Sequence, residues 1–155
     1  MDNSFLQKKE RAHKTYVAQK SIRNPYLDCD VVLNSDGFHH LRYSDRRERN
    51  KKEQILKFNL LPLALVIIKK AATLQEYRVM LIAEGKKSEG DGLRRTKRVE
   101  FWGFVAIISN DPQIKIRVVL KRIGDGNVIF WSVMPYSKLK KDIPQKLYTD
   151  SIEDE

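Results

Sequence analysis

Apolar residues recur at helical spacing along the first half of the chain. Residues 4–20 combine Lys, Gln, Glu and Ala with a weak apolar stripe, which predicts a helix. A stronger stripe passes through Ile55 and Phe58 and continues beyond Pro62 within residues 50–72. Because proline lacks a backbone N–H and suits the first turn of a helix, we expect two helices in this region, with Pro62 near the start of the second.

The segment between these helices contains residues typical of turns and helix caps. Residues 24–25, Asn-Pro, predict a turn, and residues 31–33 favour a short strand. Ser35 or Asp36 can cap a helix, because a short polar side chain accepts a hydrogen bond from the first turn. We therefore expect a short helix over residues 37–44.

The period of the apolar residues changes beyond residue 74. Four runs rich in β-branched and aromatic residues follow, namely EYRVMLIAE, VEFWGFVAIIS, IKIRVVLKR and NVIFWSVM. Residues 124–127, Gly-Asp-Gly-Asn, predict a tight hairpin between the last two runs, since these residues tolerate a positive φ. Helices followed by a meander of strands predict an α+β fold, with N-terminal helices packed on one face of a four-stranded antiparallel sheet. The other face is expected to be free as a working surface.

Length and composition fit one folded domain with a charged end. The chain has 155 residues, of which 41% are hydrophobic and 32% are charged. This length suffices for one buried core. We expect a helical extension or tether over residues 1–25, the folded domain over residues 26–136, and a charged tail over residues 137–155.

The charge balance suggests the class of partner. Thirty Lys and Arg residues against twenty Asp and Glu residues give a formal net charge of +10 and a pI near 9.7. Basic side chains that neutralise phosphates release counterions, so nucleic acid is the first expectation. An acidic protein or an anionic membrane surface are the weaker alternatives.

The cysteine content and the lack of targeting signals indicate the cellular compartment. Cys29 is the single cysteine, so no internal disulfide is expected and the chain suits a reducing compartment. The first residues carry no apolar segment typical of a secretory signal, and the apolar run at residues 60–68 is too short to cross a membrane. We expect a cytoplasmic protein without a membrane span.

Metal and cofactor motifs are missing from the sequence. It contains no CxxC, HExxH, GxxxxGK[ST] or GxGxxG pattern, and we therefore expect no metal and no cofactor.

A basic, metal-free site suits RNA cleavage. That reaction needs a group that takes the proton of the 2′-OH, a group that protonates the leaving oxygen, and cations that stabilise charge on the phosphate.

Two adjacent histidines are the candidates for proton transfer. The stretch DGFHHLRYSDRR, residues 36–47, carries His39 and His40 beside several arginines. On a helix that buries Phe38 and Leu41, both histidines lie about 130° from the buried direction, on opposite flanks. Helical spacing therefore does not choose between them. One solvated histidine and one histidine that packs against the core is the ordinary alternative.

The last two strands supply candidate phosphate ligands. Alternation places Arg117 and Lys121 on one face of their strand, with Val119 between them. In the final run, alternation separates Trp131 from Ser132, and Ser132 can face Arg117 if the register allows. An ordinary strand serine is an equally good interpretation. The basic run at residues 46–52 is typical of a solvated helix start, but it adjoins the histidines.

These motifs together resemble a known family. GFHHLRYS, a basic linker, LLPLALVIIKKA, a Trp-Gly strand, KIRVVLKR and GNVIFWSVM are similar to the phage and polymorphic-toxin nucleases of the Barnase-EndoU-colicin-RelE (BECR) superfamily. The similarity spans roughly residues 30–135, so residues 26–136 would form the nuclease domain. It implies an α+β fold with helices on a sheet of about four strands, and metal-independent RNA cleavage by toxins.

The resemblance also implies roles for individual residues. His40, which directly precedes a leucine, matches the family's motif histidine and would act as general base or acid, whereas His39 matches a variable position. Arg117 matches the strand cation that would hold the scissile phosphate, and Ser132 the hydroxyl of the last strand. Flanking RNA would be positioned by basic and aromatic side chains, namely Arg42, Tyr43, Arg47 and Lys121.

The leading hypothesis is an endoribonuclease toxin of bacteria or phages that cleaves RNA, such as tRNA, to a 2′,3′-cyclic phosphate. An acidic immunity or antitoxin protein would suit its positive surface. The alternative is a non-catalytic nucleic-acid-binding or virion-associated module on the same fold. An ADP-ribosyl transferase is a weaker idea, because we find no residue set for the nicotinamide cofactor.

Overall fold

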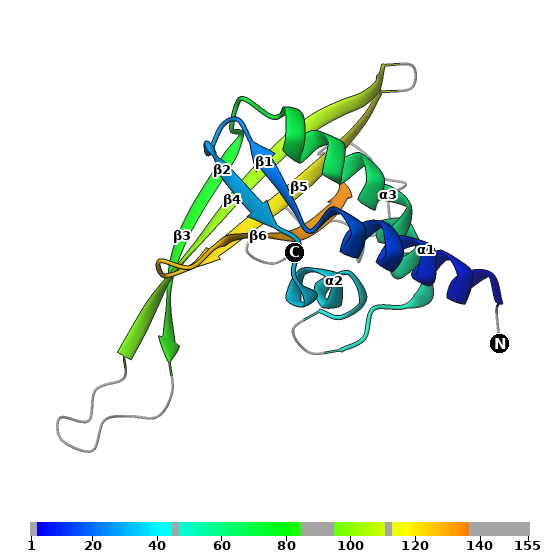
Figure 1. The fold of residues 1–155 in the computed structure, drawn as a ribbon, viewed down its shortest axis with the longest axis horizontal. Coiled ribbons are helices and arrows are strands. Elements are labelled where there is room, and N and C mark those ends of the chain that lie inside the picture. Colours follow the sequence, from blue (N-terminus) through cyan, green and yellow to red (C-terminus); the bar gives the residue numbers. More distant parts are fainter. Residues whose placement is uncertain (1–2, 45–46, 85–94, 111–112, 137–155) are drawn as a thin grey trace.

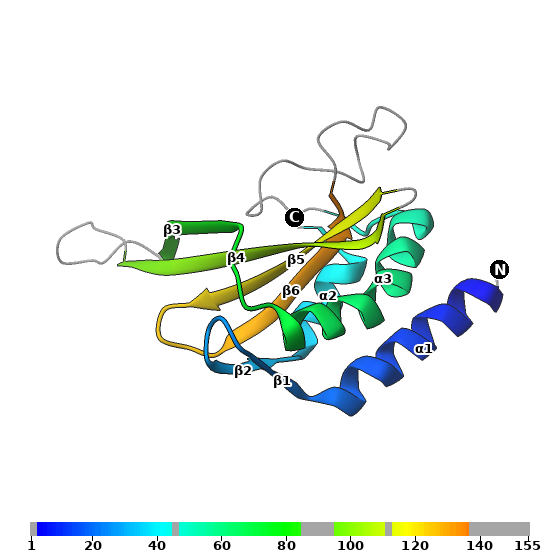
Figure 2. The ribbon, with the colours of Figure 1, turned by 90° about the horizontal axis from the view of Figure 1, so that it is seen from above.

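A computed structural model describes residues 3–44, 47–84, 95–110 and 113–136. Its helices are α1 (Asn3–Gln19), α2 (Ser35–Arg42) and α3 (Lys51–Lys70). Figures 1 and 2 show the helices gathered on one side of a curled sheet. The predicted α+β class is confirmed. The predicted charged tail, residues 137–155, lies outside the described residues.

The sheet has six strands within the described residues. They are β1 (Ser21–Asn24), β2 (Cys29–Val32), β3 (Glu76–Glu84), β4 (Arg95–Asn110), β5 (Gln113–Ile123) and β6 (Val128–Pro135). Their order is β1-β2-β6-β5-β4-β3, and β2 runs parallel to β6, while all other neighbours are antiparallel. The four predicted strands are therefore present as antiparallel neighbours. The prediction of a purely antiparallel sheet of four strands is incomplete, because the β1–β2 hairpin extends it and makes it mixed.

Helix α2 begins at a different cap from the one expected. Its N-cap is Asn34 rather than Ser35 or Asp36, and the Asn34 side chain accepts a hydrogen bond from the backbone N–H of Gly37. The Tyr16 hydroxyl donates to the Asn34 carbonyl at 2.6 Å. This contact fixes the start of α2 against α1. Burial raises the pKa of the Tyr16 hydroxyl well above its usual range.

Helix α3 is continuous, and the prediction of two helices is wrong. Pro62 lies inside the helix and removes one backbone hydrogen bond, a defect that costs about 3 kcal/mol in a helix interior. The buried face of α3 runs through Phe58, Leu61 and Ile68 on both sides of the proline. A break at Pro62 would withdraw one half of this face from the core, so packing keeps the helix intact.

The core lies between the helices and one face of the sheet. Phe5, Ala12 and Tyr16 of the expected N-terminal extension are buried in it, as is Val31 of β2. The boundaries of the expected extension stay a prediction. Hydrophobic packing thus joins α1 to the same core as the strands that follow.

The two faces of β5 follow the predicted alternation, but β6 does not. Ile116, Val118 and Leu120 join the main core, while Val119 lies on the opposite face, which we call the second face. A β-bulge interrupts the β5–β6 register, with Val119 opposite Ser132 and Leu120 opposite Phe130. Trp131 is the extra residue of this bulge and packs on the second face beside Val119. The predicted separation of Trp131 from Ser132 is therefore wrong, because directly paired residues share a face.

Among the described residues, no helix is both long enough and apolar enough to cross a membrane.

Candidate functional site

Helix α2 packs against β6 and separates the two histidines. His40 is 4% exposed, and its ring lies against the indole of Trp131, with ring centroids 4.1 Å apart and planes 16° from parallel. His39 is exposed and stacks on Tyr43, with centroids 4.4 Å apart. Helical spacing did not choose between His39 and His40, whereas the position of β6 does. His40 is the histidine enclosed by the fold.

Arg49 holds His40 from the side of the α2–α3 connection. Its Nε donates to the His40 carbonyl at 3.0 Å, and its Nη2 lies 3.3 Å from His40 Nε2. A guanidinium only donates hydrogen bonds, so Nε2 is the acceptor in this contact. Glu53, itself buried, lies 3.6 Å from Arg49 Nη1 and orients the guanidinium.

Trp131 is covered by a charged group as well as by the histidine. Lys121 Nζ lies 3.7 Å from the centre of the Trp131 ring system, and 5.7 Å from the centre of the Phe101 ring. At these distances the His40 imidazole and the Lys121 ammonium cannot lie on the same face of the Trp131 indole. The indole is therefore enclosed between His40 and Lys121, and it positions both groups instead of offering a face for base stacking.

Ser132 is tied to the middle of α3. Lys57, which is 4% exposed, donates from Nζ to Ser132 Oγ at 3.0 Å and to the Val133 carbonyl at 2.9 Å. These bonds bring a buried positive charge to the residue that follows Trp131. Charge-assisted hydrogen bonds of this kind are stronger than those between neutral groups. Lys57 therefore holds the part of β6 that carries Trp131, the stacking partner of His40.

Arg117 lies deeper on the second face than expected. It is fully buried, with Nη1 3.3 Å from Glu76 Oε1 and Nη2 3.7 Å from Met134 Sδ. Its guanidinium also lies 5.3 Å from the centre of the Tyr136 ring. The register places Arg117 opposite Met134 and Ser132 opposite Val119, so Arg117 and Ser132 are diagonal neighbours. The expectation that this face is free at its centre is wrong, because Arg117, Val119 and Ser132 are all buried.

The two predicted arginines of the α2 region are engaged with a neighbouring glutamate. Arg42 Nη2 lies 3.4 Å from Glu48 Oε1, and its Nε donates to Gln54 at 3.2 Å. Arg47 donates to the Glu48 carbonyl at 3.1 Å and lies 3.7 Å from Glu53. These contacts direct both arginines toward the start of α3.

A cavity of 270 Å³ opens where α2 meets the sheet. Four of the predicted residues line it, namely His39, His40, Tyr43 and Lys121. Asp36, Ser44 and Trp131 contribute further polar and aromatic surface. The structure therefore brings the histidines together with Tyr43 and Lys121. It leaves Arg42, Arg47, Arg117 and Ser132 outside the cavity wall.

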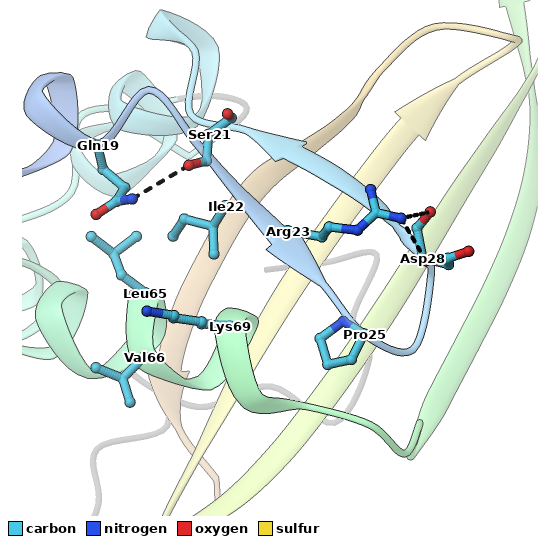
Figure 3. Close-up of a pocket in the computed structure, with 9 residues that line it drawn as sticks. All are labelled: Gln19, Ser21, Ile22, Arg23, Pro25, Asp28, Leu65, Val66 and Lys69. Carbon is cyan, nitrogen blue, oxygen red and sulfur yellow. Dashed lines mark hydrogen bonds and ion pairs between the residues drawn. The ribbon is translucent and has the colours of Figure 1, made fainter.

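A larger cavity, of 770 Å³, lies between β1 and α3, as Figure 3 shows. Among its lining residues, Arg23 donates to Asp28, and the Gln19 side chain donates to the Ser21 carbonyl. No predicted site residue lines it. Size alone would favour this cavity, but the titratable groups suited to proton transfer lie around His40.

The site also contains residues that were not predicted, namely Asp36, Ser44, Arg49, Lys57 and Trp131. Lys57 carries a signal in the sequence, because it precedes Leu61 by four residues and so shares the buried face of α3. Arg49 gives no such signal within its basic run. The position of Trp131 depends on the bulge in β6, which alternation does not reveal.

Comparisons of the chain with protein-family models, with curated proteins and with solved structures gave no match. The resemblance to BECR nucleases rests on the quoted sequence motifs and stays a prediction.

Proposed function

We propose that this protein is a metal-independent endoribonuclease whose reaction takes place in the cavity beside His40. The observation that carries the proposal is an enclosed imidazole that lines a cavity together with Lys121 and is held by Arg49. A neutral imidazole accepts a proton at physiological pH, and cations stabilise the charge that grows on a phosphate. The net charge of +10 favours a polyanionic substrate.

The chemistry follows from these groups. When RNA binds, Arg49 Nη2 leaves His40 Nε2, and Nε2 takes the proton of a ribose 2′-OH; the 2′-oxygen forms a bond to phosphorus, and the bond from phosphorus to the 5′-oxygen breaks. The leaving 5′-oxygen takes a proton from solvent, and the product strand ends in a 2′,3′-cyclic phosphate. Lys121 stabilises the pentavalent phosphate, while Tyr43 and His39 line the path of the flanking nucleotides.

In this proposal Arg117 and Ser132 are positioning residues. Their complete burial and their bonds to Glu76 and Lys57 favour a role in holding β5 and β6 in place. The position of Trp131 depends on this support, and the position of the His40 ring depends on Trp131.

The test is cleavage of total tRNA in the presence of EDTA. We expect the wild type to produce fragments with 2′,3′-cyclic phosphate ends, and His40→Ala to lower the rate by roughly 10²- to 10⁴-fold. His13→Ala is the matched control, since His13 lies on α1 and contacts Phe38 instead of the cavity. No cleavage by the wild type, or equal rates for the two variants, would refute the proposal.

A non-catalytic nucleic-acid-binding module is the second candidate. One observation favours it: both strand residues expected to contact phosphate are fully buried. This candidate predicts RNA binding that weakens with salt, no cleavage products, and no effect of His40→Ala on affinity. The tRNA experiment, with binding measured on the same samples, separates the two functions.

We further propose that the activity is toxic to bacteria and is restrained by an acidic immunity protein. The positive net charge supports such a partner. Expression of the wild type in the bacterial cytoplasm should arrest growth, and His40→Ala should restore it. Equal growth arrest by the two proteins would exclude RNA cleavage as the cause of toxicity.

A further inference from the structure

Strand β3 forms one edge of the sheet and exposes an unusual number of large apolar side chains. No described strand pairs with its outer edge. Leu81 is 70% exposed, the highest value among the large hydrophobic residues described. Its exposed apolar neighbours on the strand are Tyr77, Val79, Met80 and Ile82. Because successive side chains alternate, the apolar surface covers both faces of the strand.

The central residues of this edge, 79–83, lack the features that usually protect a sheet edge. Edge strands are kept from pairing with other chains by charged side chains, above all lysines, by prolines and bulges, or by a covering helix. The strand reads EYRVMLIAE, without Lys or Pro, and its pairing with β4 is regular along all nine residues. Figures 1 and 2 both show the β3–β4 hairpin projecting away from the three helices. Apolar surface of this kind marks an interaction site.

We propose that β3 pairs with β3 of a second copy of this chain in an antiparallel, two-fold symmetric arrangement. A two-fold axis requires each copy to present the same surface, and a single edge strand meets this condition. The pairing would join the two six-stranded sheets into one. It does not depend on the proposed ribonuclease activity.

The sequence of β3 favours one register, with Leu81 on the two-fold axis. Val79 then lies opposite Ala83, and Met80 lies opposite Ile82, so every position from 79 to 83 meets an apolar residue. Arg78 lies opposite position 84, which is glutamate in the sequence. Apolar pairs and opposite charges across a strand pair are both favourable.

The neighbouring register is less favourable. With Met80 on the axis, Arg78 would lie opposite Ile82, and position 76 would lie opposite position 84, so that two glutamates would meet at each end of the pair. Like charges directly opposite each other destabilise a strand pair. Self-association through the Leu81-centred register therefore accounts for both the apolar and the charged positions of β3.

The proposed dimer leaves the His40 cavity accessible. Strands β4 and β5 separate β3 from β6, the strand against which the cavity is built. Pairing of one short strand buries less surface than a standard stable interface, so we expect a dimer that dissociates on dilution.

Sedimentation equilibrium of the full chain from about 1 µM to about 1 mM tests the proposal. We expect a reversible monomer–dimer equilibrium in the wild type. Leu81→Lys should remain monomeric, because it places two ammonium groups on the axis. Val17→Lys is the matched control, since Val17 is an exposed apolar residue of α1, and it should dimerise like the wild type. A monomeric wild type, or a Leu81→Lys variant that dimerises equally well, would overturn the proposal.

Disulfide trapping tests the register. In a Cys29→Ser background, Leu81→Cys should form an intermolecular disulfide under mild oxidation, because directly opposed strand residues lie within the Cα separation that a disulfide spans. Val79→Cys should not, since the two copies of residue 79 would be about 13 Å apart along the strand. Preferential trapping at residue 79 would contradict this register.

Discussion

The imidazole of His40 lies nearly parallel to the indole of Trp131, with their centroids 4.1 Å apart. One residue comes from α2 and the other from the bulge of β6, so the stack joins the candidate base to the sheet. Lys121 approaches the same indole at 3.7 Å. A single aromatic side chain thus sets the separation between the group that would accept a proton and a cation that would face the phosphate.

Replacement of Trp131 should impair catalysis more than binding. In Trp131→Leu the His40 ring loses its stacking partner, and a displacement of about 1 Å can lower a rate by roughly 100-fold. We expect kcat to fall by roughly 10- to 100-fold, with the Kd for a non-cleaved RNA changed by less than about threefold. Trp131→Phe should recover most of the rate, because it restores an aromatic face. An unchanged kcat in Trp131→Leu would show that the stack does not position His40.

The sequence predicted the local elements of the fold better than their long-range pairing. Helix α2 and strands β3 to β6 have periodicities that depend on nearby residues. Strands β1 and β2 have only four residues each, and the parallel contact between β2 and β6 joins segments far apart in the chain. The continuity of α3 through Pro62 likewise depends on burial against the rest of the protein, which no local signal contains.

For the candidate site as well, the sequence predicted local geometry but not tertiary packing. Helical geometry placed His39 and His40 symmetrically about the buried direction, and in the structure the position of Trp131 distinguishes them. Alternation placed Arg117 and Lys121 on one face, as observed, but it did not reveal that Arg117 is buried and paired with Glu76. The chemical type of a residue is evident in the sequence, whereas its burial depends on tertiary packing.

Gly37 lies where α2 packs tightly against β6. A Cβ atom at residue 37 would lie 2.3 Å from the Phe130 carbonyl oxygen and 2.6 Å from the Tyr16 hydroxyl. Alanine is normally the better helix former by about 1 kcal/mol, but here the backbone must move. We expect Gly37→Ala to lower the free energy of unfolding by about 1–3 kcal/mol in urea denaturation. Ser35→Ala, at an exposed position of the same helix, should change it by less than about 0.5 kcal/mol. A stabilised Gly37→Ala variant would contradict this packing.

Glu100 should make stability depend on pH in the acidic range. Burial raises the pKa of its carboxyl group, but hydrogen bonds from Tyr77 and Arg122 outweigh burial and leave the pKa below its ordinary value. A depressed pKa in the folded state stabilises the protein above the unfolded pKa, near 4.3, and this contribution is lost as the pH falls. The unfolding free energy of Glu100→Gln should therefore decline less than that of the wild type between pH 6 and pH 3, roughly the range of carboxylate titration. Glu10→Gln, on the exposed face of α1, should follow the wild type.

The ion pair between Arg117 and Glu76 provides a test of which cations reach RNA. If Arg117 held the scissile phosphate, the Glu76 carboxylate would compete with it, and Glu76→Gln would raise RNA affinity selectively. Because Arg117 is fully buried, we expect Glu76→Gln instead to lower the free energy of unfolding by about 1–3 kcal/mol, since a neutral amide oxygen replaces the carboxylate that accepts from a buried guanidinium. Its RNA affinity should match that of Glu10→Gln, which removes the same charge from an exposed position on α1. Fluorescence anisotropy at two salt concentrations measures this comparison. A selective gain in affinity for Glu76→Gln would place Arg117 at the phosphate and would assign it a catalytic contact.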